Sequence, residues 1–208
     1  MYLSKTPRLV QSLLPNYTWH IPTTEKKVFL TFDDGPIPEA TPWVLDTLRH
    51  YGAKATFFCV GDNVRKHPAI FQRLLAEGHA AGNHTFNHLN GWKTDTPDYL
   101  DNVQQCGEMV PSPLFRPPYG SLKPSQTRQL KSRYRIVMWD VLSGDFDPKI
   151  SPEKCLQNVL ENIQPGSIVL FHDSLKAETR MRFALPKVLE KLTGEGWKFE
   201  KVDGLNAP

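Results

Sequence analysis

Two acidic residues, Asp33 and Asp34, follow a strand-like apolar run at 28–32, and two histidines, His84 and His88, come later in the chain with four-residue spacing. Two imidazoles at that spacing can reach one metal ion from one face of a helical turn. One carboxylate would complete a three-ligand set with open positions for water, which is typical of catalytic zinc. The second carboxylate would then be free to act as a base on that water.

Further along the chain, Arg116 opens the run Arg-Pro-Pro-Tyr-Gly, and His172 ends the apolar run 168–171. An Arg on a proline-rigidified element can orient a carboxylate, and the first free backbone N–H after the prolines, that of Tyr119, can serve as an oxyanion donor. A histidine beside a carboxylate such as Asp145 can act as a general acid. Taken singly, each of these residues also fits an ordinary structural role, as a cap, a rigid turn or a core-edge histidine.

Four aromatic residues, Trp43, Trp92, Trp139 and Phe146, could form a wall on which a sugar ring stacks. Aromatic residues near strand ends more commonly pack in the core or at its rim. Of these four, we therefore expect only Phe146 to contact substrate.

Composition places the chain among soluble globular proteins and excludes several other classes. It has 208 residues, of which 39% are hydrophobic and 23% charged, and a net charge of +3. No apolar run approaches the roughly 20 residues that a membrane-spanning helix needs. The charge is too small, and too evenly spread, to indicate nucleic acid as a partner. Three scattered cysteines and no evident signal peptide favour a cytoplasmic location, with a secreted or periplasmic one as the alternative if a leader has been removed.

Strand-like and helix-like segments alternate along the chain, which predicts an α/β fold with a parallel sheet. In such folds the residues that follow the strands share one edge. We expect a single domain over 1–208, with 1–25 as an N-terminal extension and the core at about 26–201. Strands are expected at 28–32, 55–60, 135–139, 168–171 and 197–201, and the run 114–120 is expected to be a short strand followed by a rigid loop. A turn is expected at 61–63. Helices are expected at 41–50, 69–77, 95–110, 124–130, 152–162 and 182–192.

Five motifs in order resemble those of the polysaccharide deacetylase family, the NodB-homology carbohydrate esterases of family 4, over roughly residues 26–201. The motifs are Thr31 to Pro36, His84 to His88, Arg116 to Gly120, Trp139 to Phe146 and Leu170 to His172. The resemblance implies a distorted, incomplete (β/α) barrel of the TIM-barrel type. The six or seven strand–helix units along the chain indicate about seven parallel strands, fewer than the eight of a complete barrel. It also implies a divalent metal ion, most commonly Zn²⁺, with Co²⁺, Ni²⁺ or Mn²⁺ as alternatives.

The resemblance assigns roles to the residues of these motifs. Asp34, His84 and His88 resemble the metal ligands, and Asp33 the general base, held by Arg116. His172 resembles the general acid, and Asp145 resembles the carboxylate that adjusts the pKa of His172. The substrate-binding residues by this resemblance are Pro118, Tyr119, Phe146 and Leu170, with Leu170 in the pocket for the acetyl methyl group.

The fourth motif departs from the family pattern, which usually has two Asp and a Trp. Leu142 stands at the first Asp position and Phe146 at the Trp, unless Asp140 or Asp147 shifts the alignment. We therefore expect a metal-dependent N-deacetylase of an N-acetylated sugar. The alternatives are a catalytically silent carbohydrate-binding protein of the same fold and a hydrolase of a non-sugar amide. The sequence leaves open the identity of the sugar, its polymer length, the metal and the oligomeric state.

Overall fold

Strand β2 (Lys27–Asp33) lies at the centre of the sheet and is buried at every residue after Lys27. It pairs in parallel with β3 (Ala55–Cys59) on one side and with β8 (Ile168–His172) on the other. A continuous apolar run of this kind is typical of a parallel strand that is covered on both faces. The structure is a computed structural model and describes residues 3–202.

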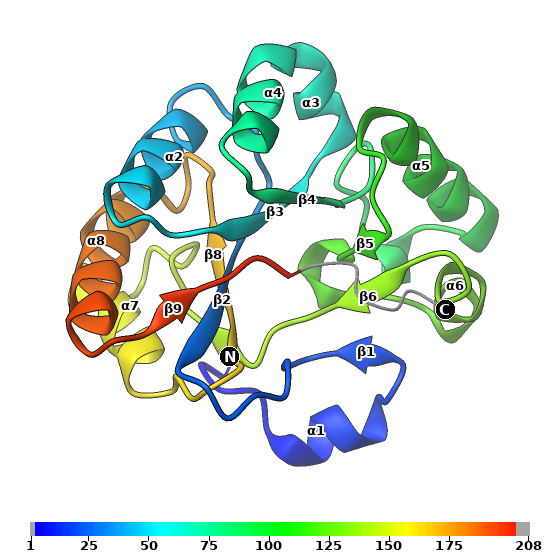
Figure 1. The fold of residues 1–208 in the computed structure, drawn as a ribbon. Coiled ribbons are helices and arrows are strands. Elements are labelled where there is room, and N and C mark those ends of the chain that lie inside the picture. The colour runs from blue at the N-terminus through cyan, green and yellow to red at the C-terminus, as the bar shows by residue number, and fades with distance from the viewer. Residues whose placement is uncertain (1–2, 203–208) are drawn as a thin grey trace.

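The strand order is β1-β6-β5-β4-β3-β2-β8-β7, with β9 beside β2, and every recorded pairing between these strands is parallel. The other strands are β1 (Tyr17–Thr18), β4 (Ala80–Asn83), β5 (Leu114–Phe115), β6 (Arg135–Val137), β7 (Val141–Leu142) and β9 (Lys198–Phe199). The sheet curls into an open barrel with helices outside it (Figure 1). Within the described residues β1 and β7 end the row, which confirms the predicted incomplete (β/α) barrel.

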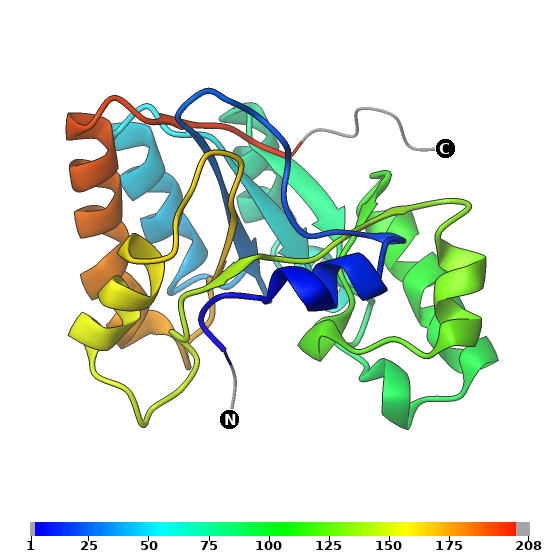
Figure 2. The same ribbon diagram turned by 90° about the horizontal axis from the view of Figure 1, so that it is seen from below.

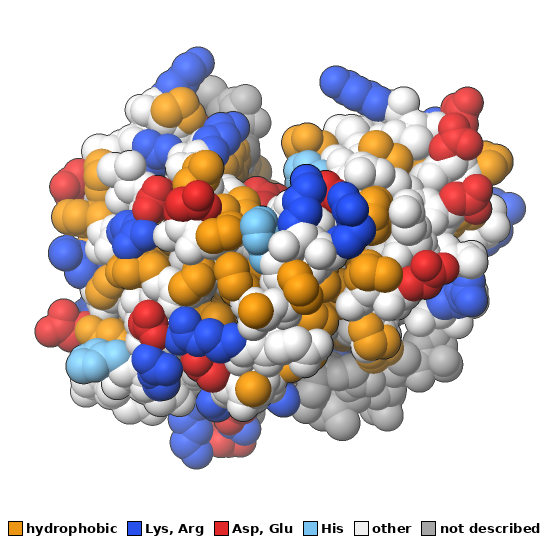
Figure 3. All heavy atoms as spheres, turned by 90° about the horizontal axis from the view of Figure 1, so that it is seen from above, with side chains coloured by type: hydrophobic (Ala, Val, Ile, Leu, Met, Phe, Trp, Pro, Cys, Tyr) orange, Lys and Arg blue, Asp and Glu red, His pale blue; other side chains and the backbone are white. Residues whose placement is uncertain are grey.

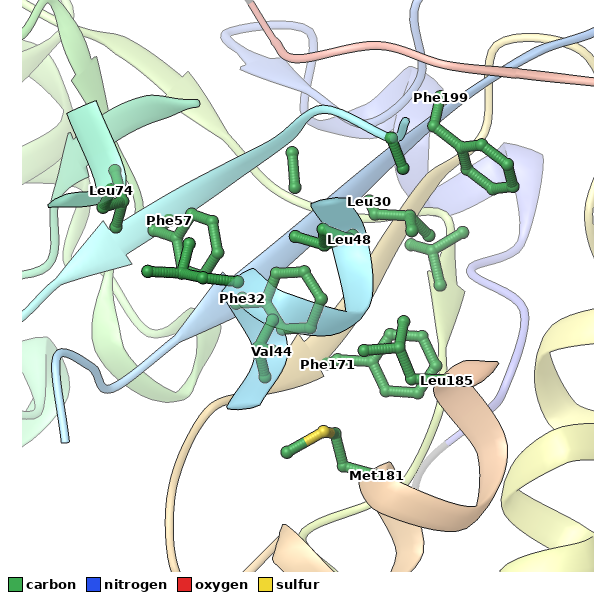
Figure 4. Close-up of a cluster of buried hydrophobic side chains, with 14 of the residues drawn as sticks. Leu30, Phe32, Val44, Leu48, Phe57, Leu74, Phe171, Met181, Leu185 and Phe199 are labelled. Atoms are coloured by element: carbon green, nitrogen blue, oxygen red, sulfur yellow. The ribbon is translucent and has the colours of Figure 1, made fainter. Parts of the chain in front are cut away.

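Eight α-helices lie within the described residues, and most cover the outer face of the sheet (Figure 1). They are α1 (Arg8–Leu13), α2 (Thr41–His50), α3 (Gly61–Lys66), α4 (Pro68–Ala76), α5 (Thr96–Met109), α6 (Pro124–Leu130), α7 (Pro152–Leu160) and α8 (Glu178–Gly194). The main core lies between β2, β3 and β8 and the helices α2, α4 and α8. Figure 4 shows side chains of this core, with Phe32 between Phe57 and Phe171.

The N-terminal segment lies across the opening between the two ends of the sheet. Beyond the β1–β6 pairing, Lys5 forms an isolated antiparallel bridge with Val141, and His20 forms one with Ser167. Residues that the sequence analysis assigned to an extension therefore take part in the barrel.

Several elements differ from those expected. The turn predicted at 61–63 was wrong, because Gly61 begins helix α3. The free N–H groups at the start of that helix bond to the carbonyls of Thr85 and Phe86, partners that no local pattern reveals. Strands β1, β4 and β7 and helix α1 were not expected. None of the helices in the described part of the chain combines the length and apolar character that crossing a membrane requires.

Candidate active site

The predicted chemical residues meet at the edge of the sheet where the parallel strands end. Asp33 is the last residue of β2 and lies in register with His172, the last residue of β8. The strand arrows of Figure 2 point toward its lower edge, and the same edge lies at the top of Figure 3, where the surface is hollowed between two lobes. This is the edge at which β/α barrels carry their active sites.

Asp34, His84 and His88 form a cluster, here called the metal-ligand cluster. One possible ligand atom from each residue lies within 4.8 Å of the others. His88 Nε2 is 3.2 Å from Asp34 Oδ1, and His84 Nε2 is 3.9 Å from the same oxygen. The Arg116 carbonyl accepts a hydrogen bond of 2.7 Å from Nδ1–H of His84, which leaves the Nε2 lone pair facing the cluster. Two imidazoles and one carboxylate with open sides fit a divalent metal ion of the zinc type.

The protonation states of the cluster also suit metal binding. Burial lowers the pKa of His84 to about 4, so its imidazole is neutral at neutral pH. Burial alone would raise the pKa of Asp34, but the hydrogen bond with His88 and the nearby histidines hold it well below its usual range. A neutral imidazole and an ionised carboxylate are the forms that bind metals.

The two histidines do not lie on a helical turn, so that part of the prediction was wrong. They lie on a loop after β4, with positive φ angles of 62° at Thr85 and 56° at His88. Asn83 Oδ1 accepts the N–H of Thr85, and Asn102 Oδ1 accepts the next two backbone N–H groups. These side chains take the donors that a helix would use, which favours a turn.

Arg116 holds one oxygen of Asp33 and leaves the other free. Its Nη1 lies 2.7 Å from Asp33 Oδ1, and its other nitrogens donate to the carbonyls of Val137 and Met138. The guanidinium is fully buried and stacks on the Phe58 ring at 4.1 Å. Asp33 Oδ2 lies 3.7 Å from His84 Nε2, so it faces the metal-ligand cluster.

His172 and Asp145 form the second pair of groups that the sequence predicted to act together. His172 Nδ1 lies 2.8 Å from Asp145 Oδ1, and the His172 backbone N–H donates to Oδ2. Burial favours the neutral imidazole, but the Asp145 charge and hydrogen bond outweigh it and raise the pKa of His172 to about 9. Asp140 instead pairs with Lys5, and Leu142 is buried beside Leu170, so Asp145 is the carboxylate of the fourth motif that serves this site.

The predicted substrate-binding residues surround this centre at different depths. Tyr119 is 66% exposed, and its ring lies edge-on to His88 at 4.8 Å, whereas Pro118 before it is buried. Tyr119 has a positive φ of 60°, and its N–H has no recorded acceptor among residues 3–202. Phe146 lies edge-on to His172 at 5.3 Å. Leu170 is buried in β8 two residues before His172, so both side chains point to the same side of the sheet.

Other aromatic residues lie elsewhere. Trp139 packs behind Arg116 at 5.7 Å, and Trp43 packs under Arg182 at 4.8 Å. Trp92 is exposed on a short 3-10 helix, η1 (Gly91–Lys93).

Sequence reasoning missed the groups that fix the Asp34 turn. Asp173 is fully buried and accepts hydrogen bonds from the Gly35 N–H at 3.0 Å and from the Thr41 hydroxyl at 2.5 Å. A Cβ at position 35 would collide with the Asp173 carboxylate. Asn63 Nδ2 donates to the Asp34 carbonyl at 2.8 Å. The Asp directly after His172 was visible in the sequence, but its partners lie in other elements.

Comparison with known proteins shows the family to which the chain belongs. The family model described as polysaccharide deacetylase matches residues 20–139. A peptidoglycan-N-acetylglucosamine deacetylase of Bacillus cereus is 38% identical over 198 residues, which is 90% of this chain and 92% of that protein. The chain belongs to the polysaccharide deacetylase family.

Other members of the polysaccharide deacetylase family match most of this chain in sequence, and a solved structure shares its fold. A chitooligosaccharide deacetylase of Azorhizobium caulinodans is 36% identical over 162 residues, covering 74% of this chain and 76% of that one. A crystal structure of a peptidoglycan N-acetylglucosamine deacetylase superposes with a TM-score of 0.86 and 33% identity, covering 95% of each chain. Because that structure covers 95% of this chain, the likeness extends beyond residue 139, where the match to the family model ends.

Proposed function

We propose that this protein is a metal-dependent deacetylase that hydrolyses the acetamido group of an N-acetylated sugar. The observation that carries the proposal is that two pairs of side chains lie beside the metal-ligand cluster, Asp33 with Arg116 and His172 with Asp145. The first pair leaves one carboxylate oxygen free to act as a base, and the second favours a protonated histidine. A pure binding protein needs neither a held base nor a histidine kept protonated. The names of the relatives support the sugar amide as substrate.

Each residue has a step that its geometry allows. Asp33 Oδ2 takes a proton from water as the water oxygen attacks the acetyl carbonyl carbon. The Tyr119 N–H donates to the oxyanion that forms on the former carbonyl oxygen. His172 then gives its proton to the nitrogen as the C–N bond breaks, which yields acetate and a free amino sugar. A divalent cation held by Asp34, His84 and His88 would supply Lewis acidity that lowers the pKa of water and polarises the carbonyl.

The test is acetate release from a panel of N-acetylated monosaccharides, chito-oligomers and peptidoglycan fragments. The protein is first stripped of metal with a chelator and then supplied with Zn²⁺, Co²⁺, Ni²⁺ or Mn²⁺. Acetate release that disappears with the metal and returns with it is the expected result, and the best panel member names the sugar.

Two other outcomes would contradict the proposal. Saturable sugar binding without acetate release would favour a silent carbohydrate-binding protein, which the altered residues Leu142 and Phe146 make worth testing. Acetate release from simple amides but from no sugar would assign a non-sugar amide hydrolase.

A further inference from the structure

A groove between α1 and α6, outside the site described above, has the chemistry of a ligand site. Its volume is about 330 Å³, and its lining includes Leu13, Tyr17, Trp92, Pro124, Arg128 and Lys131. We call it the α1–α6 groove. In Figure 1, α1 and α6 lie next to each other at the β1–β6 end of the sheet.

Trp92 is the main exposed aromatic surface of this groove, with 61% of its area accessible. The turn that carries it is fixed, because Asn90 Oδ1 accepts the Trp92 N–H at 3.0 Å and Gln126 Nε2 donates to the Gly91 carbonyl at 3.0 Å. A side chain at Gly91 would collide with the Ser121 carbonyl, so the turn packs directly on the loop before α6. A large apolar ring held on a fixed element and left open to solvent indicates a binding surface.

The charge of the groove is positive and uncompensated. Arg128 and Lys131 line it, no carboxylate does, and neither has a recorded ion pair within residues 3–202. The one polar partner recorded for the Lys131 ammonium is Asn16 Oδ1 at 3.5 Å. Elsewhere on the protein, basic side chains such as Arg65 pair with a carboxylate of their own helix. Two unpaired cations beside an aromatic ring complement a ligand that has both an apolar face and an anionic group.

The groove also lies within reach of the metal-ligand cluster. Trp92 follows His88 by four residues, so their backbones are at most about 14 Å apart. Leu122, which also lines the groove, follows Tyr119 by three residues, a span of at most about 11 Å. A chain of sugars placed at the cluster could extend past Tyr119 to Trp92.

We propose that the α1–α6 groove binds an acidic stretch of the glycan substrate, with a sugar ring on Trp92 and a carboxylate between Arg128 and Lys131. This inference rests on the proposed function and extends it by naming the substrate class. That class is a polymeric glycan that bears carboxylates, such as peptidoglycan, rather than a neutral oligomer of N-acetylglucosamine.

The experiment measures binding and not turnover. Full-length, zinc-loaded protein carrying Asp33→Asn is sedimented with insoluble peptidoglycan or with chitin, over a range of salt concentrations. Trp92→Ala and the double variant Arg128→Glu/Lys131→Glu are compared with Lys154→Glu/Lys198→Glu, which makes the same charge change at exposed positions away from the groove. Thermal unfolding checks that each variant is folded.

We expect Trp92→Ala and Arg128→Glu/Lys131→Glu each to weaken peptidoglycan binding at least about fivefold, and salt to weaken binding of the parent. The Lys154→Glu/Lys198→Glu control should bind like the parent, and chitin should bind weakly and without response to charge reversal. Unchanged peptidoglycan binding in both groove variants would overturn the proposal.

Two further results would also overturn it. Equal binding of chitin and peptidoglycan with no effect of charge reversal would mean a neutral glycan site. If the groove variants lose binding to vesicles of equal parts phosphatidylcholine and phosphatidylglycerol but bind peptidoglycan like the parent, the groove would be assigned to a membrane surface. Because binding is measured without acetate release, failure here leaves the deacetylase proposal standing, and failure of acetate release leaves this inference testable.

Discussion

Asp33 and Asp34 are neighbours in the sequence, yet their carboxylates meet different partners at one site. Successive side chains of a regular strand point to opposite faces of the sheet. Asp34 has a φ of 86°, so the strand ends there and the chain turns its carboxylate toward His88. Asp33, still in the strand, keeps its Oδ1 on Arg116. In the proposed mechanism, the left-handed conformation of Asp34 therefore lets one dipeptide supply both a metal ligand and the base.

Asp33→Asn should lower kcat by about 10²–10⁴-fold, because the amide cannot accept the proton from water. Zinc affinity should change little, since the ligand oxygen belongs to Asp34. Measurement of kcat together with bound zinc by titration checks both parts. Near-normal kcat in a zinc-loaded variant would remove Asp33 as the base.

In the proposed mechanism, the Asp145–His172 pair should set the alkaline limit of activity. The reaction needs His172 protonated, and its pKa is raised to about 9, so kcat/KM should hold at neutral pH and fall as pH rises through about 9. Asp34 and Asp33 also favour the proton, and a bound cation would oppose them and move this limit to lower pH. In Asp145→Asn the main favourable charge is lost, so the limit should move down by about 1–3 units.

The pH profiles of zinc-loaded wild type and Asp145→Asn are the measurement. His172→Gln serves as the control, since it should be slow at every pH and lack this limit. An alkaline limit that stays in place in Asp145→Asn would show that another group sets it.

At the scale of elements, the start of α2 and the end of β8 hold the turn that presents Asp34. Burial raises the pKa of Asp173 to about 8, so its carboxyl is largely neutral at neutral pH while it accepts from Gly35 and Thr41. Asp173→Ala should therefore weaken zinc binding about tenfold, the lower end of the range for residues behind metal ligands. Asp173→Asn keeps a neutral acceptor and should lose much less.

Competition with a chromophoric chelator measures the zinc affinity, and thermal unfolding of the metal-free variants shows whether the fold is kept. A folded Asp173→Ala with the affinity of the wild type would mean that the turn holds its shape without Asp173.

The elements also show what the sequence could predict. Asp33, Arg116 and His172 were found because each lies at the end of an expected apolar strand, and parallel strands bring those ends to one edge. His84 and His88 were found by their four-residue spacing alone, because the strand before them was not expected. Helices 41–50 and 124–130 matched to the residue. Local apolar spacing defines the first, and a proline at the first helical position marks the start of the second. The His loop and α3 were mistaken because each satisfies the other's backbone groups, with Gly61 N–H bonded to the Thr85 carbonyl. Short strands such as β7 depend on their neighbours in the sheet and have no pattern of their own.

At the scale of the whole molecule, the open barrel has two ends that no parallel pairing joins within residues 3–202, and the N-terminal segment spans them. Lys5 is central to this span, with its ammonium 2.7 Å from Asp140 Oδ2 and 2.7 Å from the Asn162 carbonyl. Asp140 is fully buried and also accepts from Ser167 and from the Ile168 N–H. That the chain forms a single domain, and that it is cytoplasmic, remain predictions from the sequence.

Lys5→Met should destabilise the protein by about 1–3 kcal/mol, because it leaves the buried Asp140 carboxylate without its charged donor. The Ser167 hydroxyl and the Ile168 N–H remain as donors. The Lys5 side chain is about a third exposed, so the loss should be smaller than for a fully buried pair. Urea unfolding measures the change, with Lys154→Met as a surface control expected within about 0.5 kcal/mol of the wild type. An unfolding midpoint equal to that of the wild type would mean that the Lys5–Asp140 pair adds nothing to closure of the barrel. A midpoint lowered as much by the control would mean that the effect comes from losing any surface lysine.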